Sequence, residues 1–174
     1  PPENSITELF PEHFVVFRPR DIVSGDFYWI GEREGLRFFA VADCTGHGVP
    51  GGFMSMLGIT LLNEILAEKG ITSPAEMLND LRTQVIQSLN RSRKEGYTLA
   101  RDGMDISICC VDSKNKKLRY AGANNAVTVG ANGIVRSDIS VGGLGVGFRS
   151  AITVNPNIVD GRLKLDVVDS ALGE

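Results

Sequence analysis

Apolar residues gather along the first part of the chain in short runs that are typical of β-strands. Runs rich in aromatic and β-branched residues occupy Phe14–Phe17, Phe27–Ile30 and Leu36–Cys44. The turn-like sequence GEREG joins the second run to the third. We therefore predict a β-hairpin there, with a second strand that is apolar enough to be buried.

Two helical patterns follow this hairpin. Pro50 suits the first turn of a helix and Gly70 suits the position after its end, which predicts a helix over residues 50–69. This helix is apolar around most of its circumference, so we expect it to be buried on more than one side. Ser73 and Pro74 indicate the start of a second helix. Its apolar residues recur at helical spacing: Met77, Leu78, Leu81, Val85, Ile86 and Leu89.

Beyond Gly96 the apolar residues recur with a period of two, which is typical of strands. The expected elements are a hairpin of Asp105–Asp112 with Leu118–Ala123, a hairpin within Ala126–Val135, and strands at Ile152–Asn155 and Leu163–Val168. Strands, two helices and further strands in this order indicate an α+β fold with antiparallel sheets. We interpret residues 1–11 as a lead-in and residues 12–174 as one domain.

Composition and charge narrow the class of protein. Apolar residues make up 43% and charged residues 22% of the 174 residues, and the net charge is −3, so neither nucleic acid nor an anionic membrane is an expected partner. The three cysteines form no disulfide framework and the chain opens with no signal-peptide pattern, so we expect a cytoplasmic protein. The apolar stretch Phe53–Leu66 looks too short and too polar to span a membrane.

Two aspartates stand where strands give way to glycine-rich turns. Asp26 precedes a strand in VSGDFYW, and Asp43 ends a strand just before CTGHG. Converging carboxylates repel each other unless a cation neutralises them, and Mg²⁺ and Mn²⁺ prefer such oxygen ligands. The simpler alternative is that Asp43 or Thr45 caps the following helix and that Asp26 forms a local turn. Spacing alone favours this alternative.

Longer motifs change that balance. The sequences RPRDIVSGDFYW, VADCTGHGVPGGFMSMLGITLLNEI and DGMDISICCVDSKNKKLRYAGANN resemble those of the SpoIIE/RsbU-like bacterial serine phosphatases, which belong to the metal-dependent PPM (type 2C) protein phosphatases. The resemblance covers residues 12–126. It implies an α–β–β–α sandwich, in which two antiparallel sheets are flanked by helices. The α+β order of elements agrees with that expectation.

The resemblance also implies a site and a reaction. Asp26 would lie at the metal centre, Asp43 would bridge two Mn²⁺ or Mg²⁺ ions, and Cys44 would give its backbone carbonyl to one ion. A water held between the ions would attack phosphorus in line. The implied substrate is phosphoserine or phosphothreonine on a small regulatory protein, such as an anti-sigma-factor antagonist. The domain would then be the output module of a signalling protein.

Other residues are weaker candidates for chemistry. Arg20 could bind a phosphate with its guanidinium group, although a solvated charge is the simpler interpretation. His47 could act as a general acid, but the resembled family also has Lys at this position, which argues against that role. Asp102 and Asp105 look like metal ligands by composition. We instead expect a turn at Asp102 and the start of a strand at Asp105.

The C-terminal part departs from the family pattern. The sequence LKLDVVDSALGE resembles the strand that leads into the family's Thr-Asp-Gly motif and places Asp169 at the aspartate position, but Val168 and Ser170 replace Thr and Gly. A final-strand carboxylate does not follow. Three interpretations stay open: a truncated phosphatase, a degenerate phosphatase, or a pseudophosphatase that binds a protein partner. An exposed sheet edge would also allow a homodimer.

Overall fold

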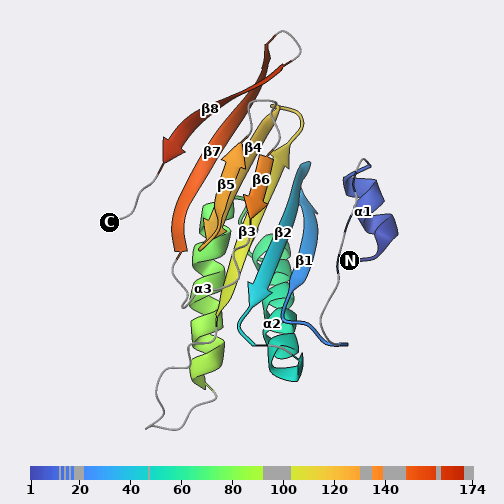
Figure 1. Cartoon of the computed structure of the whole chain (residues 1–174), viewed down its shortest axis with the longest axis vertical. Helices are drawn as coiled ribbons and strands as arrows, with labels where there is room; N and C mark the ends of the chain where they lie inside the picture. The colour runs from blue at the N-terminus through green and yellow to red at the C-terminus, as the bar shows by residue number, and fades with distance from the viewer. Residues whose placement is uncertain are drawn as a thin grey trace.

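The computed structural model of the chain describes residues 1–11, 13, 15, 17, 22–46, 48–91, 103–129, 135–138, 148–159 and 162–170. Side chains are described for those of these residues that lie within 1–90 and 103–125. Three helices and eight strands are described (Figure 1). The helices are α1 (Glu3–Leu9), α2 (Gly48–Ala67) and α3 (Pro74–Arg91). The strands are β1 (Phe27–Arg33), β2 (Leu36–Cys44), β3 (Met104–Asp112), β4 (Lys117–Ala123), β5 (Ala126–Val129), β6 (Val135–Asp138), β7 (Phe148–Val159) and β8 (Arg162–Ser170).

Six strands form one antiparallel sheet in the order β1-β2-β3-β4-β7-β8, and β5 pairs with β6 separately. The β1–β2 hairpin has the predicted position, with Arg33 paired to Leu36. Its turn residues, Glu34 and Gly35, have φ values of 55° and 76°. Two consecutive residues with positive φ give the turn the twist that matches a hairpin.

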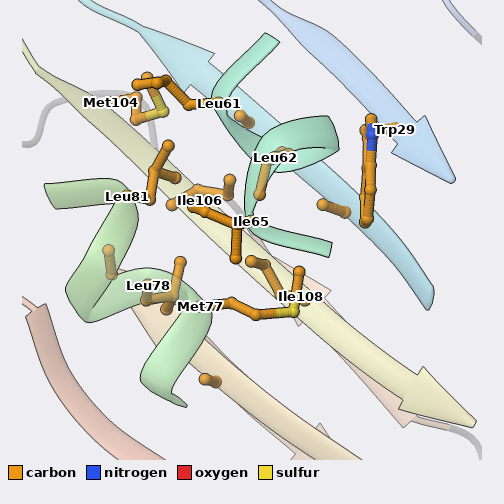
Figure 2. Close-up of a cluster of buried hydrophobic side chains, with 14 of the residues drawn as sticks. Trp29, Leu61, Leu62, Ile65, Met77, Leu78, Leu81, Met104, Ile106 and Ile108 are labelled. Carbon is orange, nitrogen blue, oxygen red and sulfur yellow. The ribbon is translucent and has the colours of Figure 1, made fainter. Parts of the chain in front are cut away.

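The hydrophobic core lies between this sheet and helices α2 and α3. Alternate residues of β2 and β3 point toward the helices, so that Phe38 and Ile108 are fully buried. Figure 2 shows Leu62 and Ile65 of α2 and Met77 and Leu81 of α3 gathered over β3. The core therefore fixes both helices on one face of the sheet.

Polar contacts join α2 to β1. The Trp29 indole N–H donates to the Asn63 side-chain oxygen at 2.8 Å. The Arg33 guanidinium donates to the backbone carbonyls of Leu66 and Ala67, each at 2.8 Å. These carbonyls belong to the last turn of α2, where no intrahelical partner is available. Arg33 thus caps the helix and ties its C-terminal end to the sheet.

The N-terminal segment contacts the opposite face of the sheet. The Phe10 and Phe39 rings meet edge to face at 5.7 Å between centroids. Arg37 lies over the Phe10 ring and donates to the Leu9 carbonyl at 2.6 Å. The lead-in expected for residues 1–11 thus contains a short helix whose C-terminal end contacts β2.

The α+β class, the β1–β2 and β3–β4 hairpins and both predicted helices are confirmed, whereas the hairpin predicted within Ala126–Val135 extends to Asp138. The strand predicted at Phe14–Phe17 is wrong where it can be judged: Val15 and Phe17 are described and neither belongs to a strand, while Phe14 and Val16 lie outside the described residues. Phe17 instead packs its ring against Tyr28. Of the predicted second sheet, the described residues contain the β5–β6 pair, and they contain no second helix pair.

Helix α2 differs from the expectation in one respect. By length and composition it is apolar enough to cross a membrane, contrary to the sequence interpretation. In this structure it is a core helix that packs against α3, β1 and β2. Burial inside the protein accounts for the same apolar composition.

Candidate active site

Asp43 lies near the end of β2, on the sheet face opposite α2 and α3. Its neighbours Ala42 and Cys44 point into the core, and the alternation of a strand turns Asp43 the other way. Asp105 of β3 pairs directly with Asp43. Opposite residues of an antiparallel pair project on the same face, with Cβ atoms about 4.5–5.5 Å apart.

Asp26 reaches the site from the turn that precedes β1. Its backbone N–H donates to the Ser24 hydroxyl at 3.0 Å, which closes a local turn. The Ser55 hydroxyl of α2 donates to the Ser24 carbonyl at 3.2 Å and holds the turn against the helix. The Ser24 side chain makes this turn, whereas the expected turn would have used the Asp26 carboxylate; the Asp26 side chain instead lies within hydrogen-bonding reach of Asp43.

Three glycines let this turn approach the loop after β2. A Cβ atom on Gly25 would lie 2.8 Å from the Gly46 carbonyl oxygen and 2.9 Å from that of Cys44. A Cβ atom on Gly51 would lie 2.6 Å from the same Gly46 oxygen and 3.0 Å from the Gly25 Cα. Contacts this short exclude any side chain, so the backbones of the turn, the loop and α2 touch at this point.

The opening of β3 is fixed to the same loop. The Thr45 N–H donates to the Gly103 carbonyl at 2.9 Å, and the Gly103 N–H donates to the Thr45 hydroxyl at 3.1 Å. Thr45 thus acts as a bridge to β3 in this structure. The reciprocal pair holds the loop after Asp43 next to the strand that carries Asp105.

The site carries an excess of negative charge. The pKa of Asp43 is raised to about 6, mainly by burial and further by the neighbouring Asp26 carboxyl group and the charge of Asp105. The salt bridges of the described residues involve none of these three aspartates. A cation would remove this repulsion.

The Cys44 thiol points into the core, away from the two aspartates. Its side chain is buried in the core, and burial together with the charges of Asp43 and Asp26 raises the thiol pKa to about 12. The thiol therefore stays protonated at neutral pH and is a poor metal ligand. Its carbonyl oxygen faces the Gly25 turn, beside Asp26.

The donors fit a hard cation. Two carboxylates within hydrogen-bonding reach and nearby backbone carbonyls are the oxygen ligands that Mg²⁺ and Mn²⁺ take. Within the described residues, no group of three or more His, Cys, Asp or Glu side chains is arranged to hold a metal ion. Asp26 and Asp43 are thus the described side chains that could hold an ion, with waters as further ligands.

An apolar groove of about 410 Å³ adjoins Asp26. One wall is the turn segment with Ile22 and Val23, and the other is the outer face of α2 with Val49, Phe53 and Met56. These side chains are largely exposed; Phe53 keeps 68% of its surface open. The groove offers apolar contacts directly beside a candidate ligand.

Asp169 is the one other predicted site residue that the described part of the chain places, and it lies away from this point. Asp169 belongs to β8, and β3, β4 and β7 lie between that strand and β2. Arg20, His47 and Asp102 lie outside the described residues, so their roles remain predictions. Asp105 was expected only to start a strand. Its pairing with Asp43 depends on the register of two strands separated by both helices, which no local sequence pattern shows.

The family model described as stage II sporulation protein E (SpoIIE) matches residues 33–160. No curated protein sequence matches the chain well enough to count as a relative.

Among solved structures, the SiaA-PP2C domain of Pseudomonas aeruginosa matches with a TM-score of 0.63 and 26% identity, over 88% of this chain and 64% of that one. The PP2C phosphatase domain of SpoIIE from Bacillus subtilis, with a fragment of its regulatory domain, matches with a TM-score of 0.51 and 18% identity, over 88% and 39%. The RsbU and RsbW domains of a Mycobacterium tuberculosis protein match with a TM-score of 0.51 and 18% identity, over 86% and 37%.

The chain thus spans less than two thirds of the length of each of these structures. The two matches at 18% identity show a shared fold. The family model covers well over half of the chain and includes β2, its following loop and β3. The chain therefore belongs to the SpoIIE family of PP2C-type serine phosphatase domains.

Proposed function

We propose that this domain is a Mn²⁺- or Mg²⁺-dependent phosphatase that hydrolyses phosphoserine or phosphothreonine on a regulatory protein. The observation that carries the proposal is the meeting of Asp26 and Asp43, from a turn and a strand end, within hydrogen-bonding reach of each other. The charge of Asp26 helps to raise the pKa of Asp43, and two carboxylates this close need a counter-charge when both are ionised. A divalent cation supplies that charge.

Each part of the site has a distinct task in this proposal. Asp26 and Asp43 would hold the cations with their carboxylates, and the Cys44 carbonyl would add an oxygen ligand. Bound cations would lower the pKa of a water molecule and neutralise the phosphate oxygens. The close contact of Gly25, Gly46 and Gly51 keeps the two carboxylate-bearing segments at a fixed separation.

The groove beside Asp26 supports a protein as the substrate. A small phosphate ester has little apolar surface, whereas residues that flank a phosphoserine can contact Phe53 and Met56. The family suggests a small phosphorylated regulatory protein, such as an anti-sigma-factor antagonist. This would make the domain the output module of a signalling protein.

The position of Asp169 favours a second candidate function. On β8 it is separated from β2 by three strands, so the described residues provide two neighbouring carboxylates and no third ligand from the C-terminal part. Mg²⁺ binds weakly where few protein ligands replace its waters. The alternative is a pseudophosphatase that binds a phosphorylated partner without hydrolysing it.

The test is hydrolysis of p-nitrophenyl phosphate and of a phosphoserine peptide, with either EDTA or Mn²⁺ at roughly 2 mM, in excess because weak binding is expected. We expect Mn²⁺-stimulated turnover by the natural chain, and turnover at least about 100-fold lower for Asp43→Ala, because the ion loses a principal ligand. The charge control is Glu32→Gln, an exposed residue at the far end of β1. Equal rates with Mn²⁺ and EDTA would exclude the phosphatase and favour the pseudophosphatase.

A further inference from the structure

Asp105 is an acidic residue beside the site, and the family resemblance assigns it no role there. It lies directly opposite Asp43 on the neighbouring strand, on the face that carries Asp26. Like charges directly opposite each other destabilise an antiparallel sheet. In the described part of the chain, no salt bridge compensates this pair.

The Asp105 carboxylate has a defined orientation. The Asn124 side-chain amide donates to Asp105 Oδ1 at 3.1 Å. Asn124 follows β4 and has a φ of 60°, in the left-handed region, where Asn is one of the few tolerated residues. The turn after β4 therefore presents its amide to Asp105 and leaves the second carboxylate oxygen for another interaction.

The C-terminal end of β2 and the start of β3 are also held together at this point. Thr45 and Gly103 exchange hydrogen bonds immediately beside the Asp43–Asp105 pair. The pair consequently cannot separate without breaking that bridge. The protein keeps two negative charges together in a place where its own contacts prevent them from moving apart.

We propose that Asp105, oriented by Asn124, is a positioning carboxylate that strengthens divalent-cation binding at Asp26 and Asp43 without contacting the ion. The absence of a three-ligand group among the described side chains agrees with an outer role. Mg²⁺ and Mn²⁺ retain waters, and groups around the ligands tune affinity through charge and hydrogen bonds. This inference rests on the proposed metal-dependent function and adds a residue to its site.

The experiment measures Mn²⁺ binding by isothermal titration calorimetry and thermal unfolding with and without Mn²⁺, both near neutral pH. Asp105→Asn keeps the shape of the side chain and an oxygen that can accept from Asn124, so it changes only the charge. Asn124→Gly removes the amide and keeps a residue that tolerates positive φ. Glu32→Gln removes one charge from the same sheet, about 20 Å along the strands from Asp43.

We expect the dissociation constant for Mn²⁺ to rise about tenfold or more in Asp105→Asn and to rise less in Asn124→Gly, in the range seen when groups around metal ligands are removed. Metal-free Asp105→Asn should unfold at an equal or higher temperature than the natural chain, because a like-charge pair is gone. Glu32→Gln should match the natural chain in both measurements.

A purely structural role for Asp105 predicts the opposite pattern. The metal-free variant would then unfold at a lower temperature and bind Mn²⁺ with unchanged affinity, and that result would overturn the inference alone. If the natural chain itself binds no Mn²⁺, both the inference and the proposed metal-dependent function fail. Measuring the natural chain first separates these two outcomes.

Discussion

The side chains of Asp26 and Asp43 lie within hydrogen-bonding reach of each other, although one residue belongs to a turn before β1 and the other to the end of β2. Burial and the neighbouring Asp26 raise the pKa of Asp43 to about 6 in the metal-free site, so this carboxyl group keeps its proton only below that pH. The pH dependence of folding follows from this relationship.

The first prediction concerns Asp43→Asn in the metal-free protein. The folded pKa of about 6 lies above the value of roughly 3.9 for an unfolded Asp, so the stabilisation from this group is complete below about pH 4 and is lost as the pH rises through 6. Asn carries no charge and avoids that loss. Because the side chain is partly exposed, we expect a gain of only about 1 kcal/mol above pH 6. Urea unfolding from pH 4 to 8 in EDTA measures it, and parallel pH profiles for the two proteins would contradict it.

The second prediction concerns Gly51→Ala in α2. Ala normally stabilises a helix relative to Gly by about 1 kcal/mol. Here its Cβ would lie 2.6 Å from the Gly46 carbonyl oxygen, so we expect a loss of about 1–3 kcal/mol from overpacking. Thermal unfolding measures the change, and Thr60→Ala on the exposed side of the same helix is the control. A stabilised Gly51→Ala variant would show that the turn and the loop can move apart freely.

The third prediction separates the Cys44 carbonyl from its thiol. Cys44→Ala keeps the backbone, so we expect Mn²⁺ affinity to stay within about twofold while stability falls by roughly 1 kcal/mol through the lost sulfur contacts. The raised pKa also predicts slow alkylation of the native thiol by iodoacetamide at pH 8. Loss of Mn²⁺ binding in Cys44→Ala would identify the sulfur as a ligand.

The fourth prediction tests the groove as the surface for a protein substrate. Phe53 is exposed and lines the groove, and its burial by a substrate side chain is worth about 1.5–3 kcal/mol. Phe53→Ser should therefore lower kcat/KM for the phosphoprotein by roughly 10- to 100-fold and leave p-nitrophenyl phosphate hydrolysis unchanged. If Phe53→Ser lowered the hydrolysis of both substrates equally, the substitution would have disturbed catalysis itself, and the groove would not be the surface for the protein substrate.

Local signals in the sequence predicted much of the fold. Alternation and turn residues located the hairpins, and Gly70 and Pro74 marked the helix boundaries because backbone preferences act over a few residues. The prediction of a strand at Phe14–Phe17 was wrong at the described residues, where the Phe17 ring packs against Tyr28 and does not belong to a strand. Apolar composition alone does not distinguish these two environments.

Sequence analysis identified only those residues of the site that lie in recognisable motifs. Asp26 and Asp43 stood out beside glycines, and the structure brings them together. Asp105 looked like an ordinary strand residue because its neighbour across the sheet is fixed by a register that spans both helices. Strand pairing between distant segments leaves no mark in a short window of sequence.

The contact of Phe10 and Arg37 bears on how the domain should be produced in the laboratory. A fragment that starts after residue 11 would lack the ring that covers Phe39 and the carbonyl that accepts from Arg37. Phe39 is already 37% exposed, and uncovering it would enlarge the apolar surface around Val41. Such surfaces promote self-association. The first residues therefore belong in any expressed form of the domain, even though their sequence suggested only a lead-in.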